Sequence, residues 1–149
     1  MRVLLTIARE RGLFVEWSRD LGVWLRGYYD APACTITLNS LCSIEQQRYA
    51  LAHELGHAWY GHTSAGDLHT DTEAERLADE HAAGLLIQPA EFAAAELLRG
   101  PHPGAIAEEL GVHQDVVEVY QRVLRRRPHR ILPHRAPGAI GVARTGMTA

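Results

Sequence analysis

The chain has 149 residues, of which 46% are hydrophobic and 22% are charged. This length allows one domain with a sizeable core and excludes two large domains, and the balance is typical of a soluble globular protein. The two cysteines, Cys34 and Cys42, are too few for a disulfide framework. The early apolar stretch at residues 3–8 is too short for a transmembrane helix or a secretion signal. We therefore expect a cytosolic protein without membrane contact.

The net charge of −3 hides two parts of opposite sign. Residues 1–121 contain all 18 acidic residues and eight arginines, a net charge of −10. Residues 122–149 contain seven arginines and no acid, a net charge of +7. Such a basic end can bind nucleic acid, contact an acidic partner or lie back on the acidic body of the chain. The sequence leaves these roles open.

The first third of the chain predicts a short helix followed by a small sheet. Residues 3–11 have a helical pattern that ends at Gly12. Three segments rich in β-branched and aromatic residues follow, at residues 13–17, 23–29 and 33–38. Turn residues separate these segments, so we expect a three-stranded, mostly antiparallel sheet.

The next element is a helix with a defined start. Ser43 and Gln46 have the spacing of a capping box, and residues 44–60 then have a helical pattern. One face of this helix carries an apolar stripe that predicts contact with the core, and it is formed by Leu51, Leu55 and Trp59.

More helices are predicted in the second half of the chain. A helix that starts near residues 70–72 ends before Pro89, because proline breaks a helix interior. Shorter helices are predicted at residues 90–98, 105–110 and 114–126. From residue 128 onward, proline, glycine and arginine accumulate without periodicity, which indicates an irregular tail.

These elements predict an α+β domain that is mostly helical, with the small sheet packed on the 44–60 helix. We assign residues 1–100 to the core of this domain and residues 101–127 to a helical extension of it. Residues 128–149 form the predicted tail.

The most informative motif is His53-Glu54-Leu55-Gly56-His57, inside the predicted 44–60 helix. Residues four apart lie on one face of a helix, so both imidazoles can reach one metal ion. Glu54 is offset from them, so its carboxylate can reach a metal-bound water as a general base. The motif predicts a zinc hydrolase in which His53 and His57 are ligands and Glu54 is catalytic.

A catalytic zinc needs a third protein ligand and an open position for water. The metzincin pattern would require glycine and histidine where the chain has Tyr60 and Thr63, so that pattern is excluded. The gluzincin arrangement takes a glutamate from the following helix, where Glu75 is the best candidate, 18 residues after the second histidine. Glu73 competes with it, although a capping box from Thr70 to Glu73 would explain that residue.

Two other side chains of this second helix have predicted roles. Asp79 follows Glu75 by four residues, so both lie on one helical face. There Asp79 can orient a ligand histidine by accepting its remaining N–H. His81 falls on the apolar stripe and is interpreted as a packed core histidine rather than a ligand.

The runs at residues 51–57 and 75–89 together resemble the ImmA/IrrE family of bacterial and phage metallopeptidases. The resemblance includes Gly27-Tyr28 and residues 36–39, and it covers about residues 1–125. His81 stands where the family usually has phenylalanine, and one extra residue precedes Pro89. Both departures lie outside the ligand set, so they bear on packing or specificity more than on zinc.

The resemblance implies a zincin-like fold that holds one Zn²⁺ per chain. It also implies a specific intracellular endopeptidase, since family members cut helix-turn-helix repressors of the Xre type. The expected partner is therefore a repressor encoded nearby, in a phage, a mobile element or a damage-response system.

Two parts of the mechanism depend on residues around the motif. The developing oxyanion needs a further hydrogen-bond donor, for which the sequence offers Tyr28, Tyr29, Tyr60 and His62. Residues 33–39 lead almost directly into the zinc helix, so we expect them to border the cleft and to bind the substrate as an added antiparallel strand. The residues assigned to that strand are Cys34, Thr35, Ile36 and Thr37.

An alternative of a different class is a regulator that binds DNA, or a toxin–antitoxin type interaction protein, with a structural or vestigial zinc site. Residues 105–112 followed by the 114–126 helix resemble a helix-turn-helix whose second helix ends in arginines. Asp115 and Glu118 oppose DNA binding, because they fall where phosphate and base contacts would be made. We favour structural packing for these helices and keep DNA binding as a rival.

Overall fold

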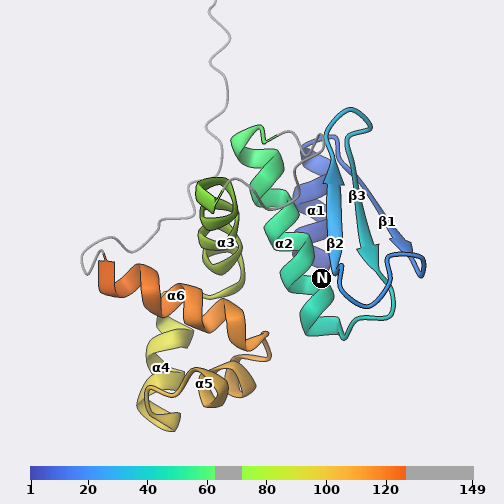
Figure 1. The fold of residues 1–149 in the computed structure, drawn as a ribbon. Coiled ribbons are helices and arrows are strands. Elements are labelled where there is room, and N and C mark those ends of the chain that lie inside the picture. Colours follow the sequence, from blue (N-terminus) through green and yellow to red (C-terminus); the bar gives the residue numbers. More distant parts are fainter. Residues whose placement is uncertain (63–71, 127–149) are drawn as a thin grey trace, which may run out of the picture.

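The computed structural model describes residues 1–62 and 72–126. The predicted tail at 128–149 and the start of the predicted capping box at Thr70 lie outside these residues. The helices are α1 (Arg2–Glu10), α2 (Ile44–Tyr60), α3 (Thr72–Leu86), α4 (Pro89–Arg99), α5 (Pro103–Leu110) and α6 (Gln114–Arg126). The strands are β1 (Phe14–Ser18), β2 (Gly27–Asp30) and β3 (Thr35–Asn39) (Figure 1). The predicted α+β class is confirmed.

The three-stranded sheet is mixed, with the order β1-β3-β2. β2 and β3 pair antiparallel, as predicted, but β1 pairs parallel to β3, so the prediction is wrong for that pair. Residue patterns mark a strand but do not give its direction relative to a distant neighbour. The loop at residues 19–26 carries the chain past β3, and the Asn39 side chain secures it by donating to the carbonyl oxygens of Gly22 and Leu25, at 2.7 and 2.8 Å.

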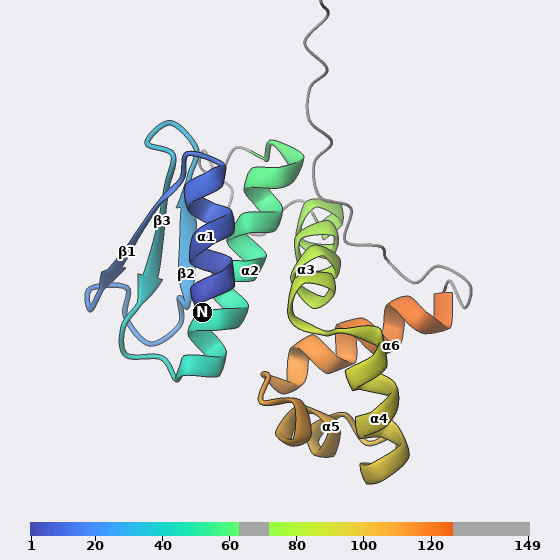
Figure 2. The same cartoon turned by 180° about the vertical axis from the view of Figure 1, so that it is seen from behind.

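One face of the sheet packs on helices. Figures 1 and 2 show α1 and α2 side by side against this face, with β2 as the strand nearest α2. Ile36 and Leu38 of the central strand are fully buried. A Cβ at Gly27 would lie 2.9 Å from the Thr37 carbonyl oxygen, a backbone atom of β3 that cannot rotate away, so this position of β2 favours glycine.

The ends of α2 are set by local interactions. The predicted capping box forms: the Ser43 hydroxyl accepts from the Gln46 backbone N–H at 3.2 Å, and the Gln46 side chain accepts from the Ser43 N–H at 2.9 Å. Gly61 ends the helix in the left-handed conformation, at φ 69°. The observed bounds therefore coincide with the predicted ones.

The described residues divide into two halves. The metal-site half comprises α1, the sheet, α2 and α3, and the helical half comprises α4, α5 and α6 (Figures 1 and 2). The helical half has its own apolar contacts, such as the Phe92 ring against Tyr120, with centroids 4.8 Å apart. α6 also packs on α3, so α3 joins the two halves.

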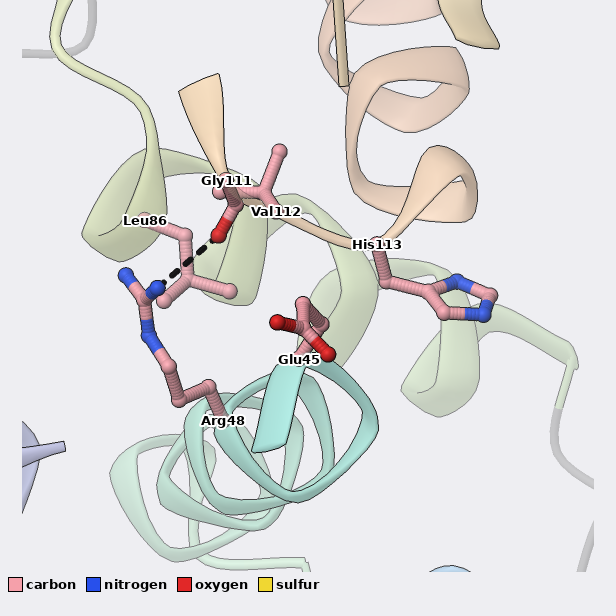
Figure 3. Close-up of a pocket in the computed structure, with 6 residues that line it drawn as sticks. All are labelled: Glu45, Arg48, Leu86, Gly111, Val112 and His113. Carbon is pink, nitrogen blue, oxygen red and sulfur yellow. Dashed lines mark hydrogen bonds between the residues drawn. The ribbon is translucent and has the colours of Figure 1, made fainter. Parts of the chain in front are cut away.

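The halves also meet at a small crevice between α2, the end of α3 and the α5–α6 turn. It is lined by Glu45, Arg48, Leu86, Gly111, Val112 and His113 (Figure 3). Arg48 reaches across it and donates to the Gly111 carbonyl oxygen at 2.9 Å. Over residues 1–62 and 72–126, no helix combines the length and the apolar character that crossing a membrane requires.

Candidate metal centre

Three side chains from two helices converge on one point. His53 and His57 stand one turn apart on α2, and their Nε2 atoms are 3.0 Å apart. The two carboxylate oxygens of Glu75, on α3, lie 3.2 Å from Nε2 of His53 and 3.3 Å from Nε2 of His57. Donor atoms about 2.0–2.1 Å from one tetrahedral zinc ion would lie roughly 3.3 Å from each other. The three residues therefore have the spacing of a metal ligand set.

The close approach of α2 and α3 depends on Gly56, which lies between the two histidines. A Cβ at this position would lie 2.8 Å from the Cα of Ala78 and 3.0 Å from its carbonyl oxygen. These are backbone atoms that cannot rotate away. A side chain at Gly56 would thus push α3, and Glu75 with it, away from the histidines.

The other nitrogen of each histidine faces a partner away from the metal position. Nδ1 of His53 lies 2.9 Å from Oδ1 of Asp79, and Nδ1 of His57 lies 3.1 Å from Nδ1 of His62. When Nε2 binds a metal, Nδ1 carries the proton and donates it to that partner. The structure thus brings Asp79 to the place where it can orient His53.

Glu54 lies beside the ligands and is 8% exposed. Its carboxylate accepts a hydrogen bond from the backbone N–H of Tyr29, on the edge strand β2. Burial raises the pKa of the Glu54 carboxyl to about 7, against the opposing charge of His53. A carboxyl group with a pKa near neutral suits proton transfer at physiological pH.

The two ligand histidines differ in charge preference without a metal. Burial lowers the pKa of His53, but the hydrogen bonds to Asp79 and Glu75 outweigh burial and raise it to about 10. Burial and the charge of His53 together lower the pKa of His57. One proton on His53 therefore partly balances the acidic groups of this centre, and a metal cation would replace it.

The model of the Peptidase M78 family, described as an IrrE N-terminal-like domain, matches residues 20–119. The chain belongs to this family. The M78 match spans more than half of the chain and includes both helices that carry the ligand cluster. It confirms the predicted ImmA/IrrE resemblance and shows a metallopeptidase. A comparison with curated proteins found no match.

The four candidate oxyanion donors of this M78 peptidase lie in different places. Tyr29 is buried, and the alternation along β2 turns Tyr28 to the face of the sheet away from α2. His62 lies on the Nδ1 side of His57, opposite the metal position. The structure therefore does not support Tyr28 or His62 as donors. Tyr60 is 43% exposed and lies three residues after His57, on the ligand face of α2.

The predicted substrate strand is corrected by the sheet order. β3, which contains Thr35, Ile36 and Thr37, is the central strand and is paired with β1 and β2 along both edges. It has no free edge for an added strand, and Cys34 lies in the turn before it. The prediction took the short connection from β3 to α2 as spatial proximity, but the edge strand beside Glu54 is β2.

Two residues that the sequence analysis disfavoured as ligands are not part of the cluster. Glu73 forms an ion pair with Arg76 on the surface of α3. His81 is half-buried and stacks on Trp59 with centroids 5.6 Å apart, as a packed histidine would.

Two residues of the centre were not predicted. One is Gly56, whose role depends on how closely α3 approaches. The other is Tyr49, whose hydroxyl donates to Oδ1 of Asp79 at 2.7 Å. The spacing of Tyr49, His53 and His57, four residues apart on one helix face, was a signal that could have identified Tyr49.

Proposed function

We propose that this M78 peptidase is a zinc-dependent endopeptidase that cleaves one specific intracellular protein. The observation that carries the proposal is the approach of His53, His57 and Glu75, whose ligand atoms lie within 4.8 Å of one another, beside the buried Glu54. Two imidazoles and one carboxylate form a ligand set that suits Zn²⁺ and leaves a fourth position open.

The chain's own residues divide the chemistry. A bound Zn²⁺ would supply the Lewis acidity that polarises the scissile carbonyl and acidifies a water molecule. The Glu54 carboxylate is placed to take a proton from the attacking water and to pass it to the leaving amine. The Tyr29 N–H holds this carboxylate in place beside the ligands. Tyr29 and Tyr60 remain the side-chain candidates for a donor to the oxyanion.

The substrate is proposed to bind along β2 rather than β3. Arg26 pairs with Asn39 through a backbone hydrogen bond of 2.9 Å, so the alternate residues Gly27 and Tyr29 direct their backbone groups to the outer edge. The Tyr29 N–H reaches Glu54 from this edge. An extended peptide on β2 would therefore pass beside the catalytic carboxylate, and backbone pairing would accept varied side chains.

An Xre-type helix-turn-helix repressor is the proposed substrate, on the basis of the ImmA/IrrE resemblance. The rival role in DNA binding is less well supported by α6. Val116, Val117 and Val119 of this helix are buried, and Asp115 pairs with Arg26 at 3.2 Å. Glu118 is exposed in the first half of the helix, where phosphate contacts would fall. These contacts favour a packing role.

Co-expression with the repressor encoded beside the chain tests the proposal. We expect repressor fragments with the wild-type protein and at least a hundredfold slower cleavage with Glu54→Gln, since a general base contributes about 10²–10⁴-fold. Glu45→Gln is the matched control, because Glu45 is an exposed glutamate in the first turn of the same helix. Intact repressor beside zinc-loaded wild type would reject this substrate. Equal cleavage by Glu54→Gln would reject the mechanism.

A further inference from the structure

Tyr49 connects the metal centre to the α5–α6 turn. It lies one turn before His53 on α2 and is 8% exposed. Its hydroxyl donates to Oδ1 of Asp79 at 2.7 Å, and the same oxygen lies 2.9 Å from Nδ1 of His53. Oδ1 of Asp79 thus lies within hydrogen-bond distance of both the Tyr49 hydroxyl and Nδ1 of His53.

The Asp79 carboxylate has a competing attraction. Its side chain is 29% exposed. Burial raises the pKa of Asp79, but the hydrogen bonds to His53 and Tyr49, and then the charges of His53 and of Arg122 on α6, lower it below its ordinary value. The two side-chain torsions of an aspartate allow its carboxylate to turn toward either side. The hydroxyl of Tyr49 approaches from the α2 side and keeps Oδ1 directed to His53.

The ring of Tyr49 is itself held from the helical half. His113, in the turn between α5 and α6, stacks on it with centroids 6.0 Å apart and an angle of 19° between the rings. The backbone N–H of Asp115 donates to Nδ1 of His113 at 3.3 Å, and Arg48 ties the same turn to α2 through Gly111 (Figure 3). Asp79 therefore holds the hydroxyl of Tyr49, and His113 holds its ring.

We propose that Tyr49 is a positioning residue of the metal centre, which holds Asp79 on His53 and is braced by His113. This inference rests on the proposed zinc site. Fixing Nδ1 of His53 as the donor leaves Nε2 unprotonated for the metal, so metal affinity depends on a hydroxyl that binds neither the metal nor a ligand nitrogen. The helical half thereby supports the metal centre through one aromatic contact.

The test is zinc affinity, measured by competition with a chelator, for wild type, Tyr49→Phe and Tyr120→Phe. Tyr49→Phe keeps the ring and removes the hydroxyl, and we expect about a tenfold weaker affinity, the lower end of the effect of such outer partners. Tyr120 is the matched control, because it is a buried tyrosine in the helical half. Tyr120→Phe should bind zinc as tightly as wild type.

A spectroscopic readout separates positioning from general destabilisation. In zinc-loaded wild type, the proton on Nδ1 of His53 should give a downfield, slowly exchanging NMR resonance, which Tyr49→Phe should broaden or shift. Should Tyr49→Phe not fold, His113→Ala should still weaken zinc binding. Equal affinity and an unchanged resonance in the variants would overturn the inference alone. Absence of zinc binding by wild type would overturn the proposed zinc site as well.

Discussion

The metal-site half and the helical half are built on different interiors. In the metal-site half, the buried residues include five polar or charged ones, namely Thr37, Asn39, Gln47, Glu54 and His57. In the described residues of the helical half, every buried residue is apolar or aromatic, as with Ile106, Val116 and Val117. Burying a polar group costs free energy unless it is hydrogen-bonded, and Asn39 and Glu54 have such partners, so the metal-site half depends on specific hydrogen bonds where the helical half depends on apolar packing.

The candidate site lies in the half that buries polar groups. Glu54 has a pKa of about 7 because it is buried, and the same burial opposes its ionised form in the folded state. The helical half carries no comparable cost and contacts the metal-site half through α6 on α3 and through the α5–α6 turn. We therefore expect the first half to govern metal binding and the second to add stability, apart from the contact of His113 with Tyr49.

A matched pair of core truncations gives the largest expected effects. Leu55 and Ile106 are both fully buried, one in each half. Leu55→Ala and Ile106→Ala should each lower the free energy of unfolding by about 2–5 kcal/mol, measured by urea denaturation. Only Leu55→Ala, next to the ligands, should also weaken zinc binding. Equal losses of zinc affinity in both variants would contradict the separation of the halves.

Gly56→Ala should harm the metal-site half although alanine favours a helix. The added Cβ would meet the Ala78 backbone at 2.8 Å, so α2 and α3 must separate. We expect a loss of about 1–3 kcal/mol in the free energy of unfolding, as for other overpacked sites. Zinc affinity should fall with it, because Glu75 moves with α3. Unchanged zinc affinity would show that the helix spacing does not set the ligand geometry.

The pH dependence of the stability of the metal-free protein tests the role of Glu54. Its pKa in the folded state, about 7, lies above the ordinary value of 4.5, so the folded state binds the proton more tightly. Stability should therefore fall as pH rises from 4.5 through 7. Glu54→Gln removes this loss and should be more stable than wild type at pH 8, by on the order of 1–3 kcal/mol. An equal difference at pH 4 and pH 8 would contradict this.

The smallest effect is expected at the ion pair between the halves. Arg26 and Asp115 lie 3.2 Å apart, with side chains 40% and 47% exposed. Such exposed pairs contribute about 0–1 kcal/mol and are screened by salt. Arg26→Gln should change the urea midpoint slightly at low salt and not at high salt. A large loss would mean that the interface between the halves depends on this pair.

Local patterns predicted the elements of this fold more reliably than their arrangement. The bounds of α2 were predictable because the Ser43–Gln46 capping box and Gly61 act within a few residues of the chain. The motif in α2 and the candidate Glu75 on the next helix also follow from helical spacing. The central place of β3 was not predictable, because pairing between distant strands depends on the path of the loop before β2. Spacing along the chain also did not predict on which side of His57 the His62 side chain lies.

The most direct test is the zinc content and zinc affinity of two glutamate variants of α3. Glu75 faces the histidine Nε2 atoms at 3.2 and 3.3 Å, whereas Glu73 pairs with Arg76 on the surface. Wild type and Glu73→Gln should each bind one zinc per chain, and Glu75→Gln should bind it at least tenfold more weakly, because a direct ligand exceeds the effect of its outer partners. Wild-type affinity in Glu75→Gln, or loss of zinc in Glu73→Gln, would contradict the proposed ligand set.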